Sequence, residues 1–225
     1  MHRKIVFHII SHLDVGGAER VAINIAESPT EGIAYHVVEL IRAHSDFTDV
    51  LIKELRDHNI TYHRGWIPEI HFHYLFERLA ALTFPLWFLW LFLKYKPQVL
   101  HSHTEMPDLS IYCFFRLFPW ALKRCKIVRT IHNTRLWTGM QRTGRHIEAF
   151  FIRQNANIAI SEAVKSNYQK HYHDSPPIIY NGVSISNPEN YFKIENADDN
   201  HPISVFIFDE MGLKVYENSN YGKNG

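Results

Sequence analysis

The stretch that decides the fold is Ile5-Val6-Phe7-His8-Ile9-Ile10, followed shortly by Gly16-Gly17-Ala18-Glu19-Arg20. The first run predicts a buried strand, and the apolar residues behind the glycines predict one face of a helix. The glycine pair predicts a turn with positive φ angles, where a ligand can approach the backbone and the free N–H groups that begin the helix. A phosphate, a sugar hydroxyl or a carboxylate suits such a turn, although Gly-Gly before a helix is also an ordinary connection.

The alternation of strand and helix continues along the chain. Runs typical of strands occur at 5–10, 36–41, 99–103, 126–132, 157–160 and 178–180, with a weaker run at 61–63. Helical spacing lies between most of these runs, which predicts a Rossmann-like, doubly wound parallel sheet of the α/β class. We assign residues 1–186 to this domain. Residues 187–225 are predicted to hold a linker, a single strand at 201–208 and an irregular polar tail.

Composition excludes several classes of protein. Twenty-four basic and 23 acidic residues give a net charge of +1, and no basic run is interleaved with aromatic residues, so we expect no nucleic-acid partner. Cys113 and Cys125 form no CxxC pair, which favours a reducing cytoplasm over a disulfide framework. Three HxH pairs occur at 71/73, 101/103 and 171/173, but none has a further ligand at a recognisable spacing, so no metal is predicted.

Polar residues follow most of the predicted strands. Ligands of doubly wound sheets bind outside the carboxyl ends of the strands. The candidates at these ends are His103, Glu105, His132, Asn133, Ser161 and Asn181. Helix capping and turn formation explain Ser161 and Asn181 equally well. His103 and His132 suit a hydroxyl-rich ligand, although either ring could instead be bonded to a neighbouring loop carbonyl.

The segment Leu79–Leu93 is apolar almost all round. Its roughly 15 residues would span about 22 Å as a helix, short of the ~30 Å hydrocarbon core, and Pro85 is expected to kink or restart it. Either the helix is buried against the sheet, or it lies in a bilayer interface with Trp87 and Trp90 at headgroup depth. We expect one face to be buried and the other to meet the cytoplasmic face of a membrane.

Five segments taken in order, 16–21, 97–103, 128–133, 159–163 and 180–183, resemble the amino-terminal half of family 4 glycosyltransferases. The resemblance implies one half of a GT-B fold, in which two Rossmann-like domains face a cleft. The first domain mainly holds the acceptor and the second mainly holds the nucleotide-sugar. It also implies sugar transfer with retention of configuration and without a metal or other cofactor.

Individual roles follow from the resemblance. Gly16 and Gly17 match the turn that lies against the donor's phosphates and sugar. His132 matches the histidine beside the transferred sugar, which makes it the candidate catalytic residue. Glu19 and Arg20 match the turn sequence, and His103 and Glu105 lie where acceptor contacts are usual.

The sequence departs from the family pattern after residue 183. Asp209 and Glu210 stand where a Gly-Arg turn is expected, and the residues that hold the donor's diphosphate and ribose are not found. We therefore expect an incomplete amino-terminal fragment, inactive alone, of a cytoplasmic or membrane-peripheral glycosyltransferase. Its substrates would be a nucleotide-sugar and a saccharide or lipid-linked acceptor of surface-polysaccharide or glycolipid assembly.

Two other functions are alternatives to this reading of the sequence. One is a stand-alone acceptor-binding module that works with a separate donor-binding chain. The other is a dinucleotide-dependent oxidoreductase, which fits poorly because no GxGxxG follows the first strand, although Glu39 could meet a ribose.

Overall fold

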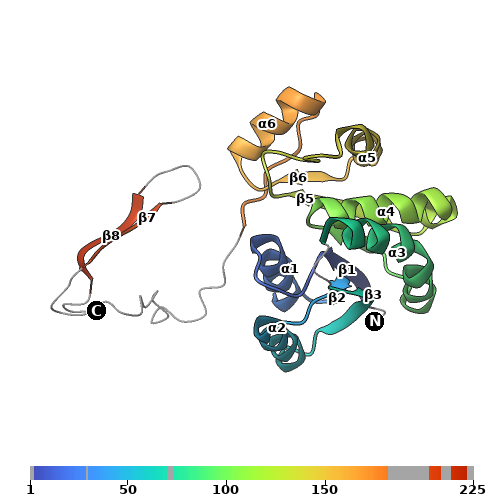
Figure 1. Ribbon diagram of the computed structural model, residues 1–225, viewed down its shortest axis with the longest axis horizontal. Helices are drawn as coiled ribbons and strands as arrows, with labels where there is room; N and C mark the ends of the chain where they lie inside the picture. The colour runs from blue at the N-terminus through green and yellow to red at the C-terminus, as the bar shows by residue number, and fades with distance from the viewer. Residues whose placement is uncertain (1–2, 29, 70–72, 182–202, 209–213, 222–225) are drawn as a thin grey trace. The chain divides into compact units, whose positions relative to one another are not determined.

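The computed structural model describes residues 3–28, 30–69, 73–181, 203–208 and 214–221, except for the side chains of 73–77 and of the last two ranges. The chain divides into two units, Met1–Gly182 and Val183–Gly225. The first contains a parallel sheet in the order β3-β2-β1-β4-β5-β6 (Figure 1). Its strands are β1 (Lys4–Ile10), β2 (Ile33–Arg42), β3 (Thr61–Pro68), β4 (Val99–Ser102), β5 (Lys126–Ile131) and β6 (Asn157–Ala159). This order confirms the doubly wound, Rossmann-like α/β architecture.

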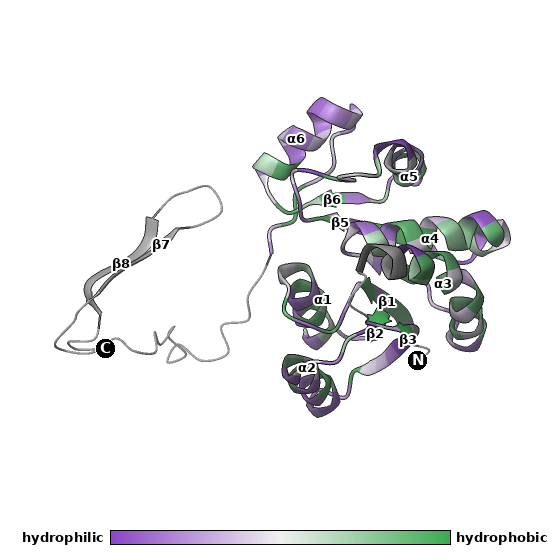
Figure 2. Cartoon of the chain, viewed as in Figure 1, coloured by the Kyte–Doolittle hydropathy of each residue, from purple (hydrophilic) through white to green (hydrophobic). Residues whose placement is uncertain are grey.

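Helices cover both faces of this sheet. They are α1 (Gly17–Glu27), α2 (Asp46–Asp57), α3 (His73–Tyr95), α4 (Glu105–Leu117), α5 (Gln141–Arg153) and α6 (Glu162–Tyr172), with a short 3-10 helix at Pro119–Lys123. Ile10 and Val37 pack with α1 and α2, whereas Phe7 and Ile9 pack with α3, α4 and α5. The alternation of Ile9 and Ile10 between the two clusters follows from the pleat of a strand buried on both faces. Figure 2 shows hydrophobic residues on the central strands and over much of α3.

Helix α3 corrects two expectations. It runs from His73 to Tyr95 without a restart at Pro85, because the neighbouring Phe84 and Phe88 are buried in the core and offset the roughly 3 kcal/mol cost of an internal proline. Trp87 is also buried and packs in the core, so of the two tryptophans only Trp90 faces outward, with 58% of its surface exposed. One face of α3 is therefore buried, as expected. Among the described residues, none of the helices is long and apolar enough to cross a membrane.

Two predicted boundaries also differ from the structure. In place of a strand at 178–180, Ile178 forms an isolated parallel bridge with Ala159, and the Ile179 N–H donates to the Ala159 carbonyl over 2.9 Å. In the second unit, β7 (Ile203–Phe208) pairs in antiparallel fashion with β8 (Lys214–Tyr221). The tail predicted to be irregular thus contains a strand, because the backbone groups of β7 can be satisfied by pairing with it.

A buried ion network joins β5 to three helices of the first unit. Arg129 on β5 is 1% exposed; its Nε lies 2.6 Å from Asp108 Oδ2 on α4, and its two terminal nitrogens donate to Glu148 on α5 over 2.6 and 2.7 Å. Glu148 also accepts from Trp137 Nε1 over 2.6 Å and from the Tyr168 hydroxyl on α6. Burial opposes the charge of Arg129, but the two carboxylates raise its pKa further above the ordinary range. Removing this one cation therefore leaves Glu148 buried without its charge partner.

Arg129→Ala should lower the free energy of unfolding by about 3–5 kcal/mol, the usual effect of breaking a buried ion pair. The matched control is Arg116→Ala, because Arg116 lies exposed in the last turn of α4 and should change stability by less than about 0.5 kcal/mol. Urea unfolding followed by circular dichroism measures both values. Equal stability of the two variants would contradict the structural importance of this network.

Six histidines of the first unit have pKa values lowered by burial. The pKa falls to about 3 for His8 and to about 4 for His36, His63 and His132, and it lies well below 6.5 for His101 and His103. The folded protein therefore holds these rings neutral at pH values where the unfolded chain binds protons. Their stabilising contribution is full above pH 6.5 and is lost as the pH falls from 6.5 toward 4. Burial raises the pKa of Asp108 to about 7 and also raises the pKa of Glu19 and Glu27, so these carboxyl groups act in the opposite direction. They are outnumbered by the six histidines.

Stability should therefore fall when the pH is lowered from 7.5 to 5.5. At pH 5.5, one unit below the ordinary histidine pKa, His8 alone should lower the free energy of unfolding by about 1.4 kcal/mol. The reason is that His8 binds a proton there in the unfolded chain but not in the folded protein. Urea unfolding at the two pH values measures the difference, and proton uptake on unfolding at pH 5.5 should accompany it. A free energy of unfolding that stays constant or rises on acidification would contradict the neutral, buried state of these rings.

Candidate functional site

The site lies where the chain reverses its winding direction, between β1 and β4. These strands are neighbours in the sheet, but β1 leads through α1 to β2 on one side, while β4 leads through α4 to β5 on the other. The two departing loops leave a crevice at the carboxyl ends of the strands. Ser11 Oγ and Thr104 Oγ1 lie 2.8 Å apart and join these loops by a hydrogen bond. Sequence spacing predicted a polar rim but did not single out Ser11 and Thr104 as its bridge.

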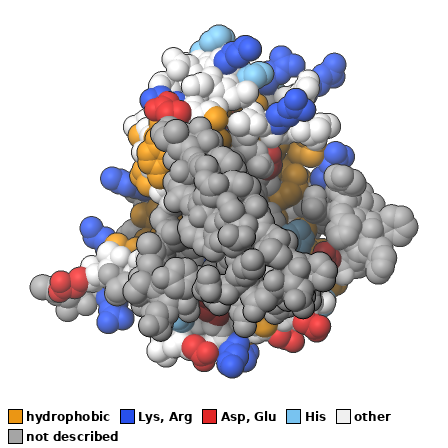
Figure 3. All heavy atoms as spheres, turned by 90° about the vertical axis from the view of Figure 1, so that its left-hand side faces the viewer, with side chains coloured by type: hydrophobic (Ala, Val, Ile, Leu, Met, Phe, Trp, Pro, Cys, Tyr) orange, Lys and Arg blue, Asp and Glu red, His pale blue; other side chains and the backbone are white. Residues whose placement is uncertain are grey.

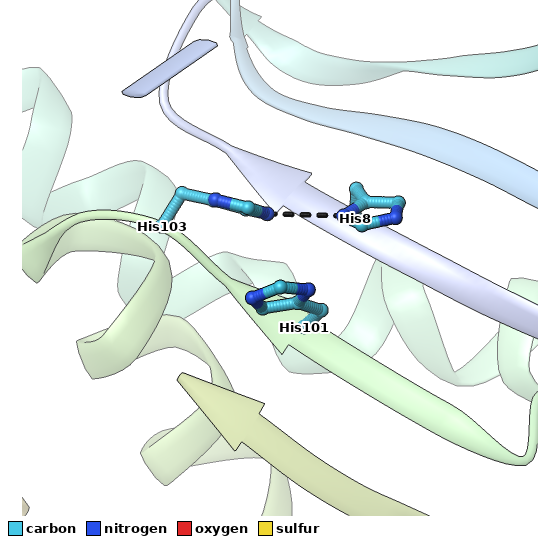
Figure 4. Close-up of side chains that lie close together, drawn as sticks. All are labelled: His8, His101 and His103. Atoms are coloured by element: carbon cyan, nitrogen blue, oxygen red, sulfur yellow. Dashed lines mark hydrogen bonds between the residues drawn. The ribbon is translucent and has the colours of Figure 1, made fainter. Parts of the chain in front are cut away.

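Three histidine rings pack together just below this crevice (Figure 4). His8 on β1 and His103 after β4 are fully buried, and His8 Nδ1 lies 3.0 Å from His103 Nε2, so one nitrogen donates to the other. The His101 and His103 rings stack with their centroids 4.1 Å apart, and His101 Nε2 is hydrogen-bonded to Thr130 Oγ1 over 2.7 Å. The cluster thus connects the ends of β1, β4 and β5. His103 has no exposed surface, and its observed contacts are the hydrogen bond to His8 and the stacking on His101. Its contact with an acceptor stays a prediction.

Within the described residues, these three rings are the group whose nitrogens lie close enough together to be considered as a metal site. One ring nitrogen from each of His8, His101 and His103 lies within 4.8 Å of the others. A zinc ion needs lone pairs that converge on a point about 2.0–2.1 Å from each nitrogen, whereas the facing nitrogens of His8 and His103 share a proton. The observed arrangement is therefore that of a hydrogen-bonded imidazole pair. Sequence spacing could not show it, because the third ring comes from β1, 93 residues before His101.

His132 follows β5 and has a half-buried ring. Its centroid lies 5.8 Å from that of His103, and its Nε2 is buried without a hydrogen-bond partner among the described residues. Burial lowers the pKa of His132 to about 4, so the imidazole is neutral at pH 7. A neutral ring can donate a hydrogen bond to a sugar hydroxyl or accept one from it, and it does not carry a full positive charge. Its position at the strand end is compatible with the predicted catalytic role, which stays a prediction.

The glycine turn has a different geometry from the one expected. Gly16 is the N-cap residue of α1 with φ −172°, and positive φ angles among the described glycines occur at Gly32 and Gly139 instead. A Cβ on Gly16 would lie 2.1 Å from Glu19 Oε2, whereas a Cβ on Gly17 would meet nothing within 4 Å. A side chain at position 16 would therefore displace the carboxylate of Glu19, which is the far end of a flexible side chain. Gly17 faces open space in the wall of a pocket of about 240 Å³.

Glu19 and Arg20 differ in their freedom to bind a ligand. Burial raises the pKa of Glu19, whose carboxylate folds back over Gly16. The Arg20 guanidinium donates to both carboxylate oxygens of Glu54 on α2, over 2.6 and 2.8 Å, and to Asn24 over 2.7 Å. These bonds join α1 to α2 and occupy much of the donor capacity of Arg20. Its substrate contact stays a prediction, and its observed contacts are structural.

The other predicted residues lie at the same end of the sheet but do not converge on one point. Glu105 begins α4 and lines a pocket of about 300 Å³ together with Ser11, Thr104 and Trp137. Asn133 and Asn181 are exposed, and Ser161 caps α6 by accepting from the Val164 N–H over 3.3 Å. The capping alternative for Ser161 therefore holds in the structure. Sequence reasoning missed Trp137, Arg78 and Met140 in this pocket, since Arg78 belongs to the apolar helix and the other two to a loop without a motif.

The hydrogen bonds of Glu39 argue against dinucleotide binding at β2. Its buried carboxylate accepts from the Leu13 N–H over 3.0 Å, from the Ala43 N–H over 2.8 Å and from Arg64 Nε over 2.6 Å. Because these bonds are internal, the carboxylate is not free to bind a ribose. The carboxylate joins the loop after β1 to the loop after β2, and so it positions the segment that leads into α1.

Comparison with known proteins identifies the relatives of this fold. The sequence profile of Glycosyltransferase Family 4 matches residues 15–187. Comparison with curated protein sequences gives no match. A glycosyltransferase from Rickettsia africae is similar in structure, with a TM-score of 0.59, 17% identity, and 81% of this chain and 44% of that chain covered.

Two further solved structures share the fold. Anabaena HepE in complex with UDP and glucose has a TM-score of 0.52 and 17% identity over 82% of this chain and 46% of that chain. The lipopolysaccharide outer core galactosyltransferase WaaB, in its apo form, has a TM-score of 0.50 and 18% identity over 81% of this chain and 46% of that chain. This chain thus spans less than half the length of these relatives. The profile match over residues 15–187, with which the sheet order agrees, shows that the chain belongs to glycosyltransferase family 4.

Proposed function

We propose that this chain forms the acceptor-side wall of a retaining glycosyltransferase that uses a nucleotide-sugar donor in surface-polysaccharide or glycolipid assembly. The observation that carries the proposal is the position of His132, a neutral imidazole with a free buried nitrogen, at the strand ends of a family 4 domain. Such a ring suits a hydroxyl of the transferred sugar. The UDP and glucose bound to HepE support a nucleotide-sugar as the donor class.

The residues suggest how the wall acts. Gly17 leaves the first turn of α1 open, so a donor phosphate can approach the N–H groups there. His132 orients the sugar by a hydrogen bond, and the hydroxyls of Ser11 and Thr104 together with Glu105 offer polar partners to an acceptor. These contributions are positional and electrostatic. Because a donor diphosphate also needs cationic or N–H partners from the facing half, we expect turnover when a donor-binding half is present, in the same chain or a separate one.

Membrane contact is part of the proposal. The outer face of α3 exposes Leu79, Leu82, Leu86, Trp90 and Leu93 at helical spacing. The Lys94 ammonium lies 4.7 Å from the Trp90 ring centroid, a pairing suited to the headgroup region of a bilayer. This face supports peripheral association with the cytoplasmic side of a membrane, where a lipid-linked acceptor would be found.

Sugar transfer from labelled UDP-sugars to membrane extract tests the function. We expect transfer when this chain is joined to the donor-binding half of HepE, and little or none from the 225 residues alone. In the joined protein, His132→Gln should lower kcat by about a hundredfold with a much smaller change in acceptor KM, because the ring acts at the transferred sugar. His146→Gln is the control, since His146 is exposed on α5. Equal kcat values for the two variants would argue against the role of His132.

The two glycines separate folding from donor binding. Gly17→Ala should leave the free energy of unfolding unchanged, because its Cβ meets open space, but it should weaken UDP-sugar binding about tenfold by filling the approach to α1. Gly16→Ala should instead destabilise the protein by about 1 kcal/mol, because alanine is a poorer N-cap residue than glycine and its Cβ must displace the Glu19 carboxylate. Thermal unfolding and calorimetric titration with a UDP-sugar give both quantities. Unchanged donor affinity in Gly17→Ala would place the donor elsewhere.

A further inference from the structure

A second pocket, of about 590 Å³, adjoins the strand-end pocket. It is lined by residues of α3, α4 and the start of α5, including Arg78, Leu82, Leu109 and Arg142. The two pockets share Arg78 and Met140 in their walls. A ligand bound at Ser11 and Thr104 can therefore continue past Arg78 into this second pocket, which no role proposed above uses.

The second pocket carries two arginine side chains that have no ion-pair partner within the described part of the chain. Arg78 and Arg142 are both exposed, and neither forms an ion pair or a hydrogen bond with another described residue. Helix α5 begins in the pocket wall, and its N-cap residue Met140 makes no side-chain bond to the first turn. Figure 3 shows many Lys and Arg side chains over the upper part of the molecule, where α5 and α6 lie in Figure 1. Two guanidinium groups from different helices, together with uncapped N–H groups, suit an anion with more than one phosphate group.

The same pocket has apolar lining residues beside the polar Gln141 and Thr143. Leu82, Leu109 and Met140 contribute to its wall. Leu82 is 62% exposed and also belongs to the outer stripe of α3 formed by Leu79, Leu82, Leu86, Trp90 and Leu93. The pocket thus meets this stripe at Leu82. An apolar chain attached to the anion could therefore pass from the pocket onto α3 at Leu82.

From these contacts we propose that the second pocket binds the diphosphate and the first units of the hydrocarbon chain of a lipid-diphosphate-linked acceptor. Polar, cationic and apolar side chains follow one another along the two pockets in the same order as the sugar, diphosphate and hydrocarbon parts of such a molecule. Polar groups at the strand ends face the sugar, Arg78 and Arg142 face the diphosphate, and the leucines face the lipid. The inference rests on the proposed function, because it identifies the acceptor class of the same enzyme.

Isothermal titration with farnesyl diphosphate, inorganic diphosphate and farnesol tests the pocket directly. Farnesyl diphosphate should bind about tenfold more tightly than either part, because both the charge and the chain contribute. Arg78→Ala and Arg142→Ala should each weaken its binding about fivefold or more, whereas Arg116→Ala on the exposed end of α4 should not. Leu82→Asn should weaken farnesyl diphosphate but leave inorganic diphosphate unchanged. All four side chains are exposed, so thermal unfolding should confirm that the variants fold.

Several results would overturn the pocket proposal. Equal affinities for farnesyl diphosphate and inorganic diphosphate would show a simple anion site, and equal affinities for farnesyl diphosphate and farnesol would show a general apolar surface. Full binding by the double variant Arg78→Ala/Arg142→Ala would place the ligand elsewhere. Failure of the two proposals is distinguishable. Sugar transfer without farnesyl diphosphate binding would reject this pocket alone, whereas the expected binding without any transfer would reject the glycosyltransferase activity alone.

Discussion

The buried charge of Arg129 is the constraint on which the site half of the first unit depends. It lies on β5 and is bound by carboxylates from α4 and α5, while Glu148 in turn accepts from Trp137 and from Tyr168 on α6. Asp108 lies in the first turn of α4, close to Glu105, and His132 follows Arg129 by three residues. One ion network thus sets the position of the catalytic candidate, the start of α4 and the Trp137 loop. Because a buried cation tolerates few alternative arrangements, this network makes the strand-end geometry specific.

Several ionisable side chains near the strand ends are neutral or already paired. Burial keeps His8, His101, His103 and His132 uncharged, and the internal bonds of Glu39 and Arg20 occupy two ionic groups that could otherwise have met a ligand. The strand-end pocket itself is lined by the hydroxyls of Ser11 and Thr104, by Glu105 and by Arg78. Hydroxyls of this kind suit sugar hydroxyls, which need donors and acceptors at fixed positions. Arg78 lines both this pocket and the adjoining one, where Arg142 is the second cation. In the proposed acceptor site, these arginines would hold the phosphate groups between the sugar and the lipid.

Much of the architecture could be predicted from the sequence, because it depends on local patterns. Apolar runs between helical segments predicted the parallel sheet, although one of the seven predicted strands, at 178–180, forms only an isolated bridge. The motifs from Gly16 to Val183 predicted family 4. The predictions failed where distant contacts decide. The apolar segment containing Pro85 remained one helix because Phe84 and Phe88 are buried. Gly16 proved extended, as is usual for the N-cap residue of a helix. The pairing of β7 with β8 was not predicted, because the sequence of the tail has no clear strand pattern of its own.

The sequence by itself determined the class of the fold, the family and the strand ends as the place to look, since strand periodicity and turn residues act between near neighbours. Only the tertiary structure decided which of the sixteen histidines meet. His8 reaches His103 across 95 positions, and Ser11 reaches Thr104 across 93, because β1 and β4 are neighbours at the reversal of the winding. It also decided that Arg78 and Arg142 share one pocket. Such pairs depend on the order of strands in the sheet and the packing of helices on it, which no local pattern encodes.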